Sequence, residues 1–199
     1  MSYGIYENGK VIAAFVAPMK VISNKPVFVS DTLSLKRATY ARTAQRWEIE
    51  SNLEPLVDSA NDLFVNLVTK GLTETVTILM PQNYGVIKKR TSTATPTAVQ
   101  ASKNSNNVTV TGNNGLIPKG TFIKFANHSK IYMLTEDFKS TSSASMYIYP
   151  NLVATVNETF KYLDDVLMSG YYDTTNIVGM SYTDGIMMDM GSVKIVEKL

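Results

Sequence analysis

Few residues of this 199-residue chain have the types and spacing that chemistry requires. The single histidine, His128, lies in a predicted turn between two strands, and the chain contains no cysteine. A general base or a metal site built on His128 would need a second histidine, a thiolate or a spaced cluster of carboxylates. We therefore predict no catalytic residue, no metal site and no bound cofactor, and we interpret His128 as a turn residue.

Two groups of carboxylates come closest to an acid–base pair. Asp164 and Asp165 are adjacent, and neighbouring residues of a strand point to opposite faces, so the two would not converge there. Asp184 precedes Gly185, which is a common turn placement, and Asp189 follows a few residues later. The sequence also lacks a glycine-rich phosphate loop and a Ser–His–Asp motif. We predict that the protein is not an enzyme.

Methionines gather near the end of the chain. Met187, Met188 and Met190 lie close together, and Met168 and Met180 precede them. Thioethers can bind soft metals, but they are more often adaptable fillers of cores and of protein interfaces. We favour the second interpretation.

Aromatic residues in the middle of the chain are the candidates for ligand binding. Small β-barrels bind sugars or single strands through exposed aromatic rings, and Tyr132 and Tyr147 are our candidate ligand-binding residues. Core packing explains most of the other aromatic residues, such as Phe122 and Phe125. The surroundings are rich in Thr and Asn and lack the positive charge that a nucleic-acid groove requires.

Composition narrows the class of protein further. The net charge is +2, with 18% charged and 44% apolar residues, so we expect no nucleic-acid sequence recognition. The basic triplet at residues 88–90 is short. The apolar run Val11–Ala17 is too short for a membrane span and lacks the features of a secretion signal. We expect a soluble protein that is made in a reducing cytosol and does not bind a membrane.

The first part of the chain reads as strands around one helix. Asn8-Gly9 between apolar residues predicts a hairpin, and alternation over 45–50 places Trp47 and Ile49 in the core. The face opposite to these two residues is predicted to be polar. That face would carry Arg46, Glu48 and Glu50.

One helix is predicted with caps at both ends, from Ser59 to Lys70. Asp58 or Ser59 can cap its start, and Lys70 with the following glycine closes its end. A single apolar stripe is expected to pack on the sheet. This stripe consists of Leu63, Phe64, Leu67 and Val68.

The middle of the chain, roughly 82–150, has a different character. From Thr91 to Asn114, 14 of 24 residues are Ser, Thr or Asn. Short alternating strands follow at 107–111, 121–126, 130–135 and 144–149, which is typical of a small barrel.

Further strands are predicted before and after this middle segment, at 32–37, 76–80, 177–182 and 192–197. The apolar stretch 160–168 fits either a helix or a strand. We therefore predict a mainly β fold (β-rich α+β) with one clear helix. A split β-sandwich or barrel lobe (1–82 plus 153–199) would carry an inserted barrel of the oligonucleotide/oligosaccharide-binding (OB) type at 83–152.

In order and spacing, these pieces resemble the distal tail protein family of long-tailed bacteriophages, in the form with an inserted OB-type barrel. The resemblance rests on the strand Thr32–Arg37, the segment Gln45–Ile49, and the capped helix that leads to Val76–Gln82. Inside the insert it rests on Pro118–Phe125, His128–Tyr132 and Tyr147–Leu152, and it covers most of the chain from about residue 30 onward.

The resemblance implies a non-enzymatic structural protein of the virion. Family members form a homohexameric ring at the tip of the tail tube, and the ring joins the tube to the hub or baseplate. The expected partners are copies of the chain itself, tail tube proteins and hub or baseplate proteins, with a host surface glycan as a further candidate. The expected location is the tail tip or baseplate, after assembly in the host cytoplasm.

Two alternatives remain open at this point. The chain is also compatible with a tube or hub subunit of a contractile tail. A protein of a different class, a binding module whose OB-type barrel grips carbohydrate or single-stranded nucleic acid, is the other alternative.

Overall fold

The computed structural model describes residues 3–31, 37–41, 44–55, 60–70, 73–163, 165–173, 181–183, 186–189 and 191–199. Within these residues the chain is mainly β, as predicted, and it contains two helices. Helix α1 spans Ala60–Lys70 and helix α2 spans Tyr84–Lys89. Helix α2 was not predicted. It is short and begins at Asn83, whose side chain accepts a hydrogen bond from the Gly85 N–H.

Six antiparallel strands form a closed first barrel in the order β1-β2-β5-β18-β15-β6. The barrel closes because β1 pairs with both β2 and β6. The predicted Asn8-Gly9 turn is confirmed, and both residues have positive φ angles (49° and 79°), as a tight hairpin turn requires. The strands are β1 (Gly4–Glu7), β2 (Lys10–Asn24), β5 (Arg46–Pro55), β6 (Val76–Leu79), β15 (Leu167–Tyr172) and β18 (Ser192–Glu197).

A second sheet of six strands has the order β14-β10-β11-β13-β8-β7. Isolated bridges from Thr97 to Thr159 and from Ala101 to Val156 bring its two edges together, so this sheet is a nearly closed barrel. Its strands are β7 (Thr97–Val99), β8 (Asn107–Thr111), β10 (Phe122–Phe125), β11 (Ile131–Leu134), β13 (Ala144–Tyr149) and β14 (Phe160–Lys161). The short strands β9 (Leu116–Ile117) and β12 (Phe138–Lys139) pair beside it.

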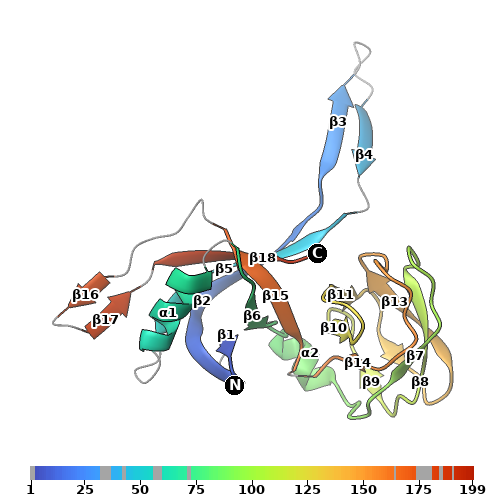
Figure 1. Cartoon of the computed structure of the whole chain (residues 1–199). Coiled ribbons are helices and arrows are strands. Elements are labelled where there is room, and N and C mark those ends of the chain that lie inside the picture. The colour runs from blue at the N-terminus through green and yellow to red at the C-terminus, as the bar shows by residue number, and fades with distance from the viewer. Residues whose placement is uncertain are drawn as a thin grey trace.

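The two barrels lie side by side, and the chain crosses between them twice (Figure 1). The crossings are adjacent, because the Met80 N–H donates to the Val166 carbonyl (2.9 Å). The stretch 160–168, which fitted a helix or a strand, forms β14 and the start of β15. Residues of the segment 153–163 pack in the second core, among them Val156, Phe160 and Tyr162. The predicted domain boundaries at 82/83 and 152/153 stay a prediction.

Two hairpins extend from the first barrel. Strands β3 (Val27–Asp31) and β4 (Arg37–Ala41) form one that projects away from both barrels (Figure 1). Strands β16 (Ser181–Thr183) and β17 (Ile186–Asp189) form the other. Most of the strands predicted at 32–37 and 177–182 lie outside the described residues, as do the helix cap at 58–59 and the turn at 184–185.

Helix α1 packs on the first barrel by one face only. Leu63 is fully buried and Leu67 is partly buried, but Phe64 and Val68 are exposed. The prediction of a single packed stripe was therefore wrong for Phe64 and Val68. Asn66, which lies between Phe64 and Val68 in the sequence, is buried instead. Its side-chain oxygen accepts a hydrogen bond from the Tyr172 hydroxyl (3.1 Å).

Candidate functional site

Tyr132 and His128 meet at one end of the second barrel. Tyr132 is fully buried, and its hydroxyl lies 2.7 Å from His128 Nε2 and accepts a hydrogen bond from the Val153 N–H (3.1 Å). Burial raises the pKa of Tyr132 to about 12 and lowers the pKa of His128. The His128 ring also bonds the Asn127 side chain. His128 thus lies in the β10–β11 turn, as predicted, and this group holds the turn in place.

Tyr147, the other candidate ligand-binding residue, lies on the outer face of the second barrel with 40% of its surface exposed. It is separate from Tyr132, so the structure does not bring the two candidates together. On the neighbouring strand β8, Asn107 lies opposite Tyr147. Two residues further along β8, Thr109 lies between Ser145 of β13 and Val99 of β7. Strands β7, β8 and β13 contain no charged residue, so this face is neutral.

Where the structure describes them, the residues singled out as possible metal or acid–base groups do not form a cluster. Among the described residues no group of three or more His, Asp or Glu side chains could hold a metal ion. Asp165 pairs with Lys161 at 3.5 Å, and Met168 is buried in the first core. The remaining residues of these sets (Asp164, Met180, Asp184 and Met190) lie outside the described residues, and the side chains of Met187, Met188 and Asp189 are not described.

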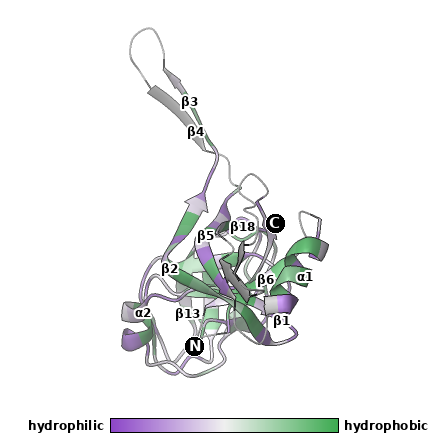
Figure 2. Ribbon diagram, turned by 90° about the vertical axis from the view of Figure 1, so that its left-hand side faces the viewer, coloured by the Kyte–Doolittle hydropathy of each residue, from purple (hydrophilic) through white to green (hydrophobic). Residues whose placement is uncertain are grey.

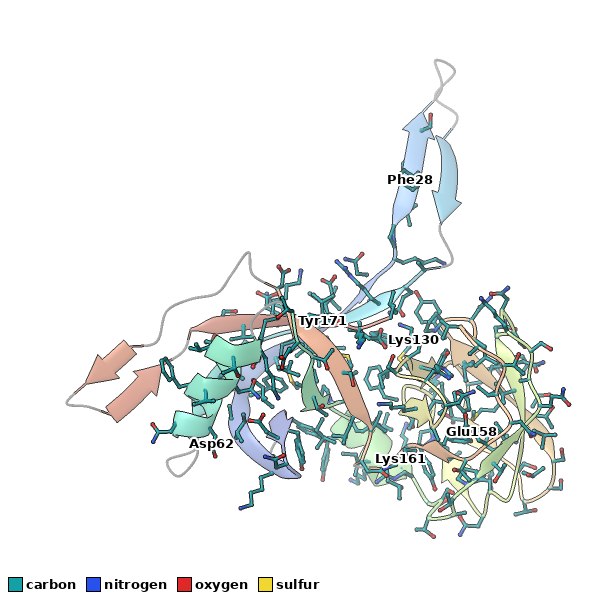
Figure 3. All side chains as sticks on the ribbon, in the orientation of Figure 1. Phe28, Asp62, Lys130, Glu158, Lys161 and Tyr171 are labelled. Carbon is teal, nitrogen blue, oxygen red and sulfur yellow. The ribbon has the colours of Figure 1, made fainter. Side chains whose placement is uncertain are left out.

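Two apolar surfaces, one on helix α1 and one on the β3–β4 hairpin, face solvent. Helix α1 exposes Phe64, Val65 and Val68 on the side opposite to its buried face, with exposed fractions of 43%, 56% and 65%. The projecting hairpin exposes Val27, Phe28 and Val29 at about one half each. Figure 2 shows hydrophobic residues along α1, and Figure 3 shows Phe28 on the hairpin, far from both barrels. We refer to these surfaces as the helix patch and the hairpin patch.

Polar side chains fill part of the junction between the two barrels. Lys130, just before β11, is buried and donates to the main-chain and side-chain oxygens of Gln45 (2.7 and 2.8 Å) and to Glu197. Figure 3 shows Lys130 between the two barrels. Burial lowers the pKa of Lys130, and the carboxylate of Glu197 opposes that shift.

Glu197 and Trp47 complete this contact from the first barrel. The Glu197 carboxylate, which is fully buried, accepts from the Ile131 N–H (2.7 Å) and from the Trp47 N–H (2.9 Å). The Trp47 indole N–H donates to the Ile131 carbonyl (2.9 Å). Trp47 is a buried core residue, as predicted, and its ring packs edge-on against Phe122 and Tyr149 of the second barrel.

A second polar contact lies beside the chain crossing. The Gln82 amide donates to the Phe122 carbonyl (2.9 Å) and accepts from the Phe122 N–H (3.1 Å). Close to it, the Lys124 ammonium donates to the Leu167 carbonyl (2.7 Å), and burial lowers the pKa of Lys124. Most of these polar contacts are buried, and each joins a residue of one barrel to a residue of the other, so they hold the two barrels together.

The sequence did not predict these junction residues, although one signal was present. Val193, Ile195 and Glu197 occupy alternate positions of β18, and all three are buried. An acidic residue in the buried register of a strand needs a partner, which indicates an internal contact. Lys130 and Gln82 carry no comparable signal, because each stands at the end of an element.

The fold and the junction define a two-barrel β protein. Residues 87–164 match the family model described as the B domain of distal tail protein pb9. The matched range begins inside α2 and ends after β14, so it corresponds to the second barrel. This match confirms the predicted resemblance to the phage distal tail protein family, and that family is one of virion tail components. No curated protein gives a significant match. Among the described residues, none of the helices is long and apolar enough to cross a membrane.

Proposed function

We propose that this chain is a non-enzymatic structural subunit of a phage tail. In this proposal copies of the chain form a homo-oligomeric ring of six subunits at the tail tip, assembled in the host cytoplasm, and the ring joins the tail tube to the hub or baseplate. The observation that carries the proposal is the match of the second barrel to the distal tail protein B domain.

The helix patch supports self-association. A helix that packs on its own barrel normally has a polar outer face. Helix α1 instead has Leu63 and Leu67 toward the barrel and Phe64, Val65 and Val68 toward solvent. A helix with apolar residues on both faces is typical of an element that is covered on both sides, and a neighbouring subunit is the cover we propose.

The hairpin patch supports the same proposal. An isolated two-stranded ribbon is marginally stable in water, and β3–β4 projects beyond the barrels with Val27 and Val29 about half exposed. Because it extends far from its own barrel, this hairpin can reach a neighbouring molecule. We assign it to contacts between subunits or with the tube and hub proteins.

A second candidate function has one observation in its favour. Tyr147 presents its ring on a neutral face bordered by Asn107, Thr109 and Ser145. Aromatic rings beside hydroxyl and amide groups suit a neutral carbohydrate, whereas a nucleic acid would require positive charge. A host surface glycan is therefore the ligand that this face of the second, OB-like barrel would accept.

Sedimentation velocity over a range of concentrations tests the proposed function. The ring proposal predicts one discrete larger species that grows with concentration at the expense of the monomer. A chain that stays monomeric up to its solubility limit would contradict self-association. It would leave glycan binding as the better-supported function.

A further inference from the structure

The backbone of Ile131 depends on the first barrel for its hydrogen bonds. In the second sheet, β11 pairs with β10 at Ile131, but β13 pairs with β11 only at Met133 and Leu134. The N–H of Ile131 bonds the Glu197 carboxylate, and its carbonyl bonds the Trp47 indole. Two side chains of the first barrel therefore take the place of a neighbouring strand.

Glu197 is bonded to both barrels at once. One carboxylate oxygen accepts from Ile131 in the second barrel, and the other accepts from Trp47 in the first. The Lys130 ammonium also donates to this second oxygen and to Gln45. The Lys130 and Glu197 side chains are 2% and 0% exposed, so water does not replace any of these partners.

The position of this contact determines what it can do. Both chain crossings lie together near Met80 and Val166, with the Gln82 contact beside them. Two adjacent crossings alone would form a hinge. The contact of Glu197 is made by the last strand of the first barrel, β18, and so gives a second attachment outside the crossings (Figures 1 and 3).

The energetics favour a role in orientation over one in stability. A buried ion pair contributes little net stability, because removing both charges from water offsets their attraction. Breaking such a pair is strongly unfavourable, since it leaves an uncompensated buried charge. Any other orientation of the second barrel would take Lys130 and the Ile131 N–H away from Glu197, and so would incur this cost.

We propose that Glu197 is a positioning residue that selects a single orientation of the second barrel relative to the first. The two barrels then move as one rigid body, and the Tyr147 face points in one fixed direction from the first barrel. This inference stands whether or not the chain forms a ring.

Spin-label distance measurement tests the inference directly. The chain has no cysteine, so Asn52→Cys on β5 and Ser145→Cys on β13 introduce the only two thiols, both at exposed positions. Labelled protein is diluted with unlabelled protein, so that distances between molecules do not contribute. The native chain should give one narrow distance distribution.

Glu197→Gln keeps the shape of the side chain but removes the charge that binds Lys130. We expect a distribution at least twice as wide, while circular dichroism stays that of a folded β protein. Ile195→Val, two residues away on the same strand, is the matched control; it loses a buried methyl group but no polar contact, and should keep the native width. A Glu197→Gln protein with the native width would overturn the inference.

Two further measurements separate positioning from stability. Adding Lys130→Met to Glu197→Gln removes the remaining buried charge and should recover melting temperature, while the distance distribution stays wide. Recovery of the native width would overturn the inference.

In the unmodified chain, the Ile131 and Trp47 amides should be protected from hydrogen exchange to the same degree. Exchange of the Ile131 amide as fast as that of exposed loop amides would contradict the role of Glu197, and this result does not depend on any variant folding.

Discussion

Glu48 illustrates how a residue can depart from the pattern of its strand. Arg46, Glu48 and Glu50 lie on the face of β5 opposite to Trp47 and Ile49, yet Glu48 is buried with 2% exposure. Its carboxylate accepts from Asn24 (2.7 Å) and Arg46 (3.0 Å) and pairs with Lys194 (2.9 Å). Three donors from three strands make this burial tolerable, and the sequence alone does not place them together.

The pKa of Glu48 gives a prediction about acid stability. Burial raises this pKa, but the hydrogen bonds from Lys194, Asn24 and Arg46 outweigh burial and hold it below the ordinary value of 4.5. The unfolded chain therefore takes up the proton first, and the stabilisation from Glu48 is complete above pH 4.5 and is lost as the pH falls through the lowered pKa.

Glu48→Gln should remove that part of the acid dependence. At neutral pH we expect it to lower the free energy of unfolding by about 1–3 kcal/mol, because it loses charge-assisted hydrogen bonds. Urea titrations at pH 7 and at pH 3 measure both quantities. An equal loss at the two pH values would show that the charge of Glu48 is not the cause.

Tyr147 allows a prediction about ligand binding. If the neutral face binds glycan, Tyr147→Ala should weaken binding by about 1–3 kcal/mol, taking the range known for nucleic-acid bases stacked on aromatic side chains, with little change in folding. Saturation-transfer NMR with neutral oligosaccharides measures this. Val99→Ala on the same face is the control, and equal effects of the two variants would argue against a stacking role for Tyr147.

At the scale of the element, the sequence predicted α1 well in position but not in orientation. Its span and its last residue, Lys70, agree with the structure. The stripe was misassigned because the apolar residues from Leu63 to Val68 spread over about half of the helix circumference, so periodicity alone does not identify the core side. The face of α1 that packs on the barrel includes Asn66, which accepts a hydrogen bond from the Tyr172 hydroxyl. Burial raises the pKa of Tyr172 well above its ordinary value.

The exposed face of α1 leads to a prediction about assembly. Val68→Asp should lower the stability of the monomer by no more than about 1 kcal/mol, because Val68 is exposed and the main cost is a negative charge in the last turn of α1. It should weaken self-association by tenfold or more, or about 1.4 kcal/mol, because a charge would be buried at the proposed contact. Sedimentation velocity measures this association.

Thr69→Asp is the matched control for that experiment. It adds the same charge in the same turn of α1, at another exposed position next to the apolar face. If both variants associate as the native chain does, the helix patch is not the contact. If both weaken association equally, Val68 has no special part in the contact.

At the scale of the whole molecule, the sequence predicted the two-part β organisation but not how the parts are joined. Strands with clean alternation, such as β8 and β13, appear where they were expected. Apart from the buried register of Glu197, the junction was not predictable, because Gln45, Lys130 and Glu197 are far apart in the sequence and only the fold brings them together. Short-range patterns do not encode such contacts.

Removal of the second barrel tests whether the first is a domain in its own right. Replacing residues 83–164 by a short Gly-Ser linker joins ends that lie close together, so the first barrel should keep its β circular dichroism. Its free energy of unfolding should fall by a few kcal/mol, because Trp47 loses the rings of Phe122 and Tyr149. Trp47 is the only tryptophan, so its fluorescence should shift to the red. An insoluble or unfolded product would show that the two barrels form one folding unit.

Electron microscopy of the purified protein shows whether copies of this chain form the ring that we propose for the phage tail tip. Negatively stained particles should be rings with an open centre, and their rotational symmetry gives the number of subunits, for which we predict six. The Val68→Asp protein, prepared in the same way, should show fewer rings. Single, separate particles at every concentration of the native chain would contradict the proposed ring.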